Sequence, residues 1–233
     1  MLRRSLGFLL AAVMLCAAAG VGASAATLEN EARVLVEGTL AVLESGTYTL
    51  KSKISPDYPY RNAYYVDQNR CALEEGAVLG WFSRLVLGQR RRTIYLPGET
   101  FTCYPDRQIY VKEKQKWEPN FSTPLDDAVA YIDIDSLTAR LVTREGKEYI
   151  AAQMSLVFPG TDIPDDLHIT KTFFYLDGQL NMVEITFNDL TDMFVFEELE
   201  QTVDESVFKP SGIRLPAFIL FIVLLFDFAV LFW

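Results

Sequence analysis

The sequence predicts an α+β fold, in which a mostly antiparallel sheet is accompanied by one or two helices and followed by a C-terminal transmembrane helix. Three observations support this prediction. Apolar residues recur with a helical period in residues 28–45, short β-prone runs separated by turn signals follow, and the last eighteen residues are almost entirely apolar. Because few long segments separate the β-prone runs, consecutive strands should pair as hairpins, which makes the sheet mostly antiparallel.

The chain opens with the pattern of a secretory signal peptide, which we assign to residues 1–25. Arg3 and Arg4 form a short basic region, an apolar stretch follows, and Ala23-Ser24-Ala25 supplies the small residues of a cleavage site. The alternative is an uncleaved N-terminal anchor, but the apolar stretch is short and rich in Ala and Gly. We therefore expect export across the cytoplasmic membrane and cleavage after Ala25.

The exported domain, predicted over residues 26–212, is strongly acidic. Cleavage would remove two basic residues and no acids, leaving 19 basic against 31 acidic residues and moving the formal charge from −10 to −12. Binding to nucleic acid depends on clustered Lys and Arg that neutralise phosphates. The composition therefore argues against a nucleic-acid partner.

An amphipathic helix is predicted to open this domain at Leu28–Ser45. Its apolar or small residues, among them Ala32, Val36 and Leu43, follow a helical period, and Gly46 marks its end. The run STPLDDAVAYIDIDSLTARLV predicts a second helix, with Ser122 or Thr123 as its N-cap.

Strands are predicted in the segments between and after these helices. The apolar run GAVLGWFSRLVLGQ is assigned to a strand, although its period is ambiguous. In TKTFFYLDGQLNMVEITF, Asp177-Gly178 separates two β-prone runs and predicts a type I′ hairpin. The other predicted strand segments are GTYTLKSKIS, RNAYYVDQNRCALEE, RRTIYLPGETFTCYPDRQIYVKEK, GKEYIAAQMSLVF and DMFVFEELE.

The C-terminal tail, residues 213–233, predicts a membrane anchor. Every residue from Pro216 to Trp233 except Asp227 is apolar or Pro. Thirteen of these eighteen residues are Leu, Ile, Val or Phe, which contribute about −4 to −8 kcal/mol to insertion, against about +3 kcal/mol for a central Asp. This predicts a protein held at the outer face of the cytoplasmic membrane. Arg214 on the outer side runs against the usual charge bias.

No catalytic motif is present, and we expect a protein that is not an enzyme and has no cofactor or metal. The single histidine, His168, lies in a Pro- and Asp-rich segment, and no serine or cysteine has the surroundings of a nucleophile. The only basic run is Arg90-Arg91-Arg92. It is interpreted as a solvated turn, with contact to anionic lipid headgroups as the alternative.

Cys71 and Cys103 are the two cysteines that would remain after cleavage. In an oxidising compartment they could form a disulfide, because their strands are expected to be near neighbours. Two separate buried thiols are the alternative.

The exported domain, over about residues 28–210, resembles the bacterial lipoprotein-carrier (LolA-like) superfamily, the half-barrel type that sorts outer-membrane lipoproteins. The resemblance is carried by the hairpin YLDGQLNMVEITFND, by the closing element Asp204-Glu205-Ser206-Val207-Phe208-Lys209-Pro210 and by the turn in TFTCYPDRQIYV. It implies an incomplete β-barrel, in which a strongly curved sheet wraps around one or two helices and leaves an apolar cavity for acyl chains.

Aromatic residues concentrate in the predicted strands, and doublets such as Phe173-Phe174 put rings on both faces of a sheet. Trp81, Phe82 and Phe173 are therefore the candidates for lining such a cavity, with ordinary core packing as the alternative. The predicted function is a membrane-tethered protein that binds a lipid or lipoprotein acyl chain. The alternative is an envelope sensor of the same fold that acts through a protein partner.

Overall fold

The protein is described by a computed structural model over residues 25–53, 61–76, 81–114, 121–158, 169–188 and 190–231. Within these ranges, side chains are described up to residue 226, and the side chain of Trp81 is left out of the description. The chain divides into two compact units: unit 1 is Met1–Thr39 with Tyr131–Asp192, and unit 2 is Leu40–Ala130 with Met193–Trp233. Of the predicted signal peptide only Ala25 is described, at the start of the first helix.

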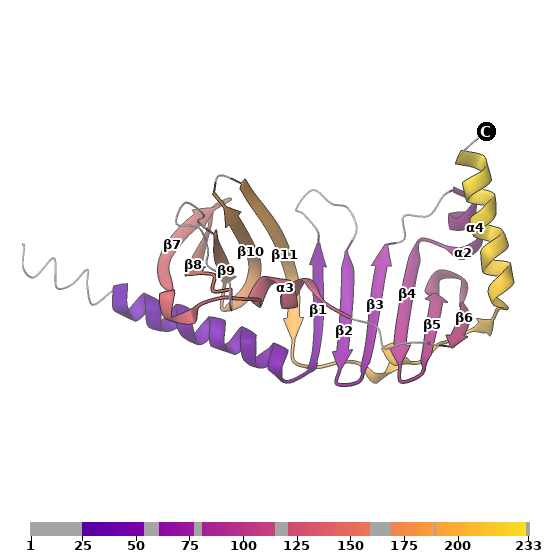
Figure 1. Cartoon of the computed structure of the whole chain (residues 1–233), viewed down its shortest axis with the longest axis horizontal. Helices are drawn as coiled ribbons and strands as arrows, with labels where there is room; N and C mark the ends of the chain where they lie inside the picture. The colour runs from indigo at the N-terminus through magenta and orange to yellow at the C-terminus, as the bar shows by residue number, and fades with distance from the viewer. Residues whose placement is uncertain are drawn as a thin grey trace, which may run out of the picture. The chain divides into compact units, whose positions relative to one another are not determined.

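Unit 1 contains the predicted opening helix and four antiparallel strands (Figure 1). The helix covers residues 25–44, of which the first fifteen belong to this unit. Ala32, Val36 and Thr39 are buried at helical spacing, and the Thr39 hydroxyl lies 3.0 Å from the hydroxyl of Tyr175. The elements that follow are η2 (Ile134–Ser136), β7 (Thr138–Arg144), β8 (Lys147–Ser155), β9 (Ile169–Leu176) and β10 (Gln179–Phe187), with the strands in the order β10-β9-β8-β7.

The β9–β10 hairpin turns at Asp177-Gly178 as predicted. Asp177 has φ 50° and Gly178 has φ 78°, and two successive positive φ values are what a type I′ turn requires. On β9, both Phe173 and its neighbour Phe174 are buried. The two faces of this strand are therefore both covered.

Unit 2 is built on a second set of strands, which pair antiparallel except where β12 runs parallel to β6. These strands are β1 (Thr47–Lys53), β2 (Asn62–Asp67), β3 (Arg70–Gly76), β4 (Arg90–Leu96), β5 (Glu99–Tyr104), β6 (Ile109–Lys114), most of β11 (Leu190–Glu200) and β12 (Ile213–Arg214). Their order is β12-β6-β5-β4-β3-β2-β1-β11.

The two faces of this sheet follow from the strand register. Tyr64, Leu73, Thr93 and Thr102 are successive cross-strand partners on β2 to β5, and we call their side face A. Side chains alternate between faces along a strand. The opposite side, face B, is therefore defined by the neighbouring row of partners, which is Tyr65, Ala72, Ile94 and Phe101.

Two predicted elements differ from the structure. The run assigned to a strand forms a helix, α2 (Trp81–Leu87), in its second half, whereas residues 77–80 lie outside the description. The second predicted helix is confined to α3 (Pro124–Val129), capped by Thr123 in a capping box with Asp126. Beyond α3 the chain passes into η2 and β7, because its β-branched residues favour extended structure.

The predicted fold class is wrong, because the twelve strands found among the described residues form an open, mostly antiparallel sheet rather than an incomplete barrel wrapped around helices. Two short helical elements, η1 (Pro105–Arg107) and η3 (Glu205–Phe208), and the helix α4 (Ala217–Leu231) complete unit 2.

The predicted transmembrane helix at residues 213–233, and with it the predicted anchoring at the membrane, is also wrong. Among the described residues, no helix has the length and apolar character needed to cross a membrane. Residues 213 and 214 are used in β12, and α4 has 15 residues, about 22 Å at 1.5 Å per residue, against about 30 Å for a bilayer core. The helix instead packs on α2, with the ring centroids of Phe82 and Phe226 5.2 Å apart.

Candidate ligand-binding face

Charged side chains are distributed unevenly over the two faces of the unit 2 sheet. Face B carries a series of ion pairs, namely Lys51–Glu198, Lys53–Glu197, Asp67–Arg70, Glu74–Arg92 and Glu99–Lys112. In the part of the chain that the structure describes, face A carries one ion pair, between Arg91 and Glu75. Face B, with its charged side chains, therefore suits contact with water. Face A has few charges, so other parts of the protein or a ligand should shield it from water.

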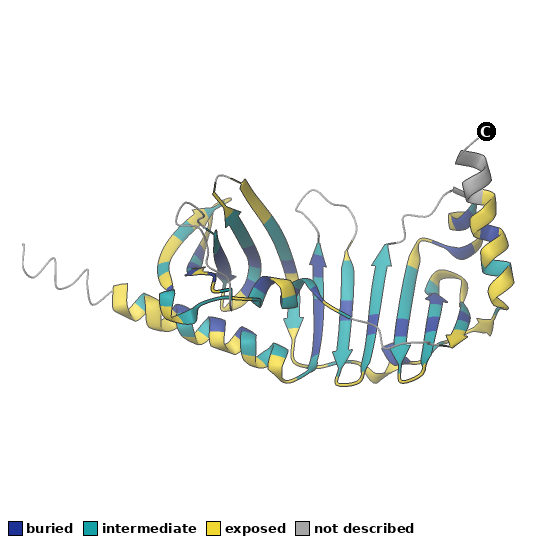
Figure 2. Cartoon of the chain, in the orientation of Figure 1, coloured by how far each residue is buried: buried dark blue, intermediate teal, exposed yellow. Residues whose placement is uncertain are grey.

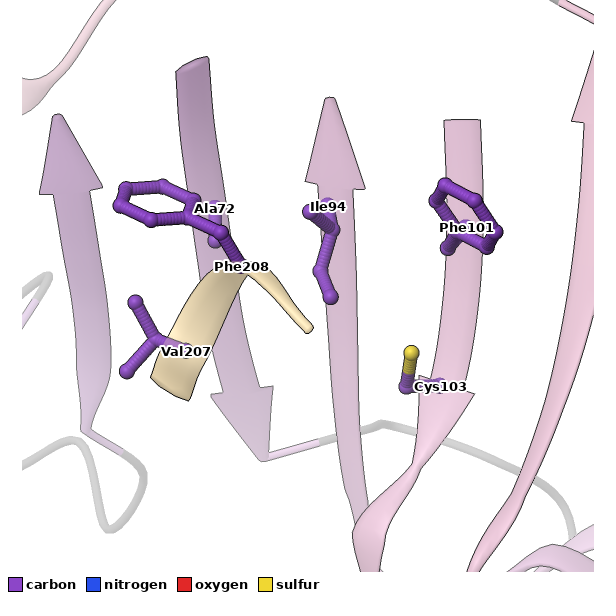
Figure 3. Close-up of a cluster of buried hydrophobic side chains, with 6 residues drawn as sticks. All are labelled: Ala72, Ile94, Phe101, Cys103, Val207 and Phe208. Atoms are coloured by element: carbon purple, nitrogen blue, oxygen red, sulfur yellow. The ribbon is translucent and has the colours of Figure 1, made fainter. Parts of the chain in front are cut away.

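Face B is partly covered by the closing element of the chain, residues 204–210. Its Val207 and Phe208 pack against Ala72, Ile94, Phe101 and Cys103 (Figure 3). Figure 3 shows the two side chains reaching from η3 toward the strands.

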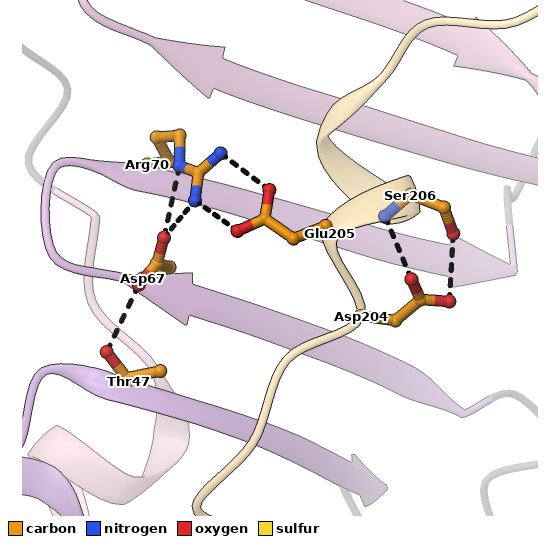
Figure 4. Close-up of polar contacts among 6 residues, drawn as sticks. All are labelled: Thr47, Asp67, Arg70, Asp204, Glu205 and Ser206. Atoms are coloured by element: carbon orange, nitrogen blue, oxygen red, sulfur yellow. Dashed lines mark hydrogen bonds and ion pairs between the residues drawn. The ribbon is translucent and has the colours of Figure 1, made fainter.

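A polar clasp holds this element in place (Figure 4). Arg70 donates through Nη1 and Nη2 to the carboxylate of Glu205, at 3.0 and 2.8 Å, and it also contacts Asp67. Hydrogen bonding to Arg70 lowers the pKa of both carboxyl groups. Asp204 in turn accepts hydrogen bonds from the backbone and hydroxyl of Ser206. Residues 204–210, which carry part of the resemblance to the lipoprotein carriers, are therefore held against face B by this clasp.

Among the described residues, segments outside the sheet cover face A in two places. In the first, Phe121 contacts Tyr64 on β2 and Tyr95 on β4, the strands on either side of β3, with ring centroids 6.3 and 5.8 Å apart, and the chain continues into α3. In the second, Tyr104 is buried with Leu87 of α2 and Val223 of α4.

Face A also carries a strip of uncharged residues, one of which, Tyr95, contacts Phe121. It consists of Val66, Cys71, Leu73, Thr93, Tyr95 and Thr102, all of them half-buried. We call these residues the face A strip. Figure 2 shows the teal of half-buried residues along much of their strands. The strip crosses β2 to β5, about 14 Å at roughly 4.8 Å between strands. Its side chains can offer an apolar ligand contact area together with a few hydroxyl groups.

The Arg91–Glu75 pair lies at one end of the face A strip. Arg91 is two residues before Thr93 on β4, and Glu75 is its cross-strand partner on β3. Burial raises the pKa of Tyr104 above its ordinary value, although the positive charge of Arg91 opposes this shift. The arrangement is thus an uncharged surface with one ion pair, Arg91–Glu75, at its edge.

The two cysteines do not form the predicted disulfide, because both are free thiols. Cys71 pairs across strands with Tyr95 on face A, whereas Cys103 pairs with Arg92 on face B, and β4 separates their strands. Side chains that point to opposite faces of a sheet cannot meet the geometry of a disulfide. Burial raises the pKa of Cys71 to about 12 and that of Cys103 to about 11, so neither thiol is activated.

The predicted cavity-lining residues lie elsewhere than the face A strip. The side chain of Trp81 is outside the description, and Phe82 packs in the cluster between α2 and α4. Phe173 belongs to unit 1 and is fully buried there. Of the residues that form the strip, only Cys71 was singled out from the sequence, and for a different reason. Period-two alternation within β2 to β5 was the signal that could have found the others.

Within the described ranges, no group of three His, Cys, Asp or Glu side chains could hold a metal ion. The single histidine, His168, lies outside the described residues. The strip itself contains no ionisable group other than the thiol of Cys71 and the phenol of Tyr95. Burial raises the pKa of both groups.

Comparisons with known proteins add little to this description. No family model matches the chain, and no curated protein matches it in sequence. Among solved structures, it is similar to an uncharacterized conserved protein from Thermus thermophilus. The identity is 11%, the match covers 77% of this chain and 99% of that chain, and the TM-score is 0.33.

Proposed function

We propose that the protein is a non-catalytic binder of an acyl chain, which it holds on the face A strip of unit 2. The observation that carries the proposal is the division of charge between the two faces. Face B bears the ion pairs and a bracing element, whereas the strip on face A is uncharged and half-buried. An apolar ligand on the strip would add to the cover that Phe121, α2 and α4 give to face A.

The energy of such binding can be bounded. Each buried methylene contributes about 0.8 kcal/mol, and a micromolar Kd corresponds to about 8 kcal/mol. About ten methylenes buried on the strip would therefore give micromolar affinity before the costs of association are subtracted. This is the chain length of an ordinary acyl group, in keeping with the resemblance to lipoprotein carriers.

The proposal predicts that Leu73→Gln weakens binding of dodecan-1-ol by at least about tenfold, because it places an amide in the middle of the strip. The measurement is isothermal titration calorimetry on the full chain. The control is Leu141→Gln on β7 of unit 1, where the leucine is 54% exposed and binding should be unchanged. Failure of the wild-type protein to bind the alcohol at concentrations on the order of 100 μM would contradict the proposal.

An interaction domain acting through a protein partner is the second candidate. It is favoured by the outer side of α4, where Phe218 and Phe221 are 63% and 64% exposed. The same titration separates the two functions. An acyl binder loses the alcohol with Leu73→Gln and keeps it with Phe221→Ala, whereas a protein that works only through a partner binds no alcohol at all.

A further inference from the structure

The basic run at the start of β4 is divided between the two faces of the sheet. Arg92 pairs with Glu74 on face B, and Arg90 donates to Asp106 at 2.8 Å. Arg91 alone turns to face A, because side chains alternate along the strand. Three consecutive arginines thus have different roles, and one of them lies at the end of the face A strip.

Arg91 has unused hydrogen-bonding capacity. Its Nη2 contacts the Glu75 carboxylate, whereas its Nε is buried and has no hydrogen-bond partner among the described residues. A guanidinium carries five N–H donors, and a buried donor without a partner costs about 1–3 kcal/mol. Glu75 therefore orients the guanidinium through Nη2, and no described residue accepts from Nη1, whose donors are left for a further acceptor.

The position of Arg91 matches the polar end of an amphiphile. An acyl chain lying on Leu73 and Thr93 would have its far end toward Tyr95, near Phe121, and its head beside Arg91. The planar fork of a guanidinium suits the two oxygens of a carboxylate or phosphate. Glu75 already offsets one charge, so the gain from an anion comes from directed hydrogen bonds as well as from charge.

We infer that Arg91 binds the acidic headgroup of the ligand, and hence that the ligand is an anionic amphiphile, a fatty-acid carboxylate or an alkyl phosphate. This inference rests on the proposed function, because it assumes that the chain occupies the face A strip. It adds the class of headgroup and the residue that recognises it.

The test compares dodecanoate, dodecyl phosphate and dodecan-1-ol by calorimetry on the full chain. We expect at least one of the two anions to bind at least about tenfold more tightly than the alcohol, which is about 1.4 kcal/mol. Arg91→Gln should remove this preference and leave the affinity for the alcohol within about twofold. The tighter anion identifies the headgroup.

Arg92→Gln is the matched control, because it removes the neighbouring arginine and its ion pair on face B. It should leave the preference for the anion unchanged, and thermal unfolding of each variant checks that it is folded. The inference is overturned if the wild type binds the alcohol as tightly as both anions, or if Arg91→Gln keeps the preference. If dodecan-1-ol still binds when the inference fails, the proposed function survives. If none of the three ligands binds, the inference and the proposed function are both wrong.

Discussion

Replacing Phe208 with alanine is expected to lower the free energy of unfolding of unit 2 by about 3–5 kcal/mol, the range for a fully packed aromatic side chain. Phe208 is 4% exposed and packs with Ala72 and Ile94 on face B. Its ring also lies 4.7 Å from the guanidinium carbon of Arg70. The substitution therefore removes both the apolar filling of face B and the ring against which Arg70 of the clasp packs.

Denaturant unfolding measures this loss. Phe221→Ala is the control, because it removes the same side chain from α4 of the same unit, where Phe221 is 64% exposed. Its effect should stay below about 1 kcal/mol. Equal losses in the two variants would show that the closing element contributes no more than an exposed surface residue.

Replacing Gly212 with alanine is expected to cost about 3 kcal/mol or more, through the backbone. Gly212 has φ 99°, and a Cβ added there would lie 1.8 Å from the carbonyl oxygen of Gln108. The same carbonyl accepts from the Ile213 N–H at 2.8 Å, in the parallel pairing of β12 with β6. Backbone strain of about 1–3 kcal/mol and the loss of this hydrogen bond, about 1 kcal/mol, therefore act together.

Because α4 begins only five residues later, the pairing of β12 also places α4, and limited proteolysis of the tail should become faster in Gly212→Ala. Gly98→Ala is the control. Gly98 has φ 78° but nothing within 4 Å of an added Cβ, so it reports the conformational cost alone, about 1 kcal/mol. A Gly212→Ala protein as stable as the Gly98→Ala protein would contradict the predicted clash.

Local patterns predicted those elements whose signal is short-range. The opening helix follows from the spacing of Ala32 and Val36, and the hairpin follows from Asp177-Gly178. The predicted strand segment RRTIYLPGETFTCYPDRQIYVKEK also forms strands, as β4, β5 and β6. In each case the residues that determine the structure are neighbours in the chain.

Tertiary contacts decided the elements that were predicted wrongly. In α2, Phe82 and Leu87 pack against α4, and a short apolar run cannot itself distinguish a strand from a helix. The apolar tail was assigned to a membrane because transfer energies count only hydrophobicity. Its residue Val223 is instead buried against Leu87 and Tyr104, a protein environment that the same energies cannot distinguish from lipid.

The candidate site was largely hidden in the sequence because it depends on register across four strands. Leu73, Thr93 and Thr102 belong to no motif in the sequence and form a surface only when β3, β4 and β5 align. The arginine run was interpreted as one unit, although alternation separates Arg91 from Arg92. Placing Glu74-Glu75 opposite Arg91-Arg92 in an antiparallel strand pair could have predicted that Arg91 and Arg92 lie on opposite faces of the sheet.

Photo-crosslinking tests the central claim, that face A of unit 2 holds an acyl chain, most directly. A long-chain alcohol carrying a diazirine in its alkyl chain is bound to the full chain, irradiated and mapped by mass spectrometry of the peptides. We predict that the labels fall on the face A strip, at Leu73, Thr93 or Thr102. Labels concentrated on face B, at Tyr65 or Lys112, or on the strands of unit 1, would contradict it.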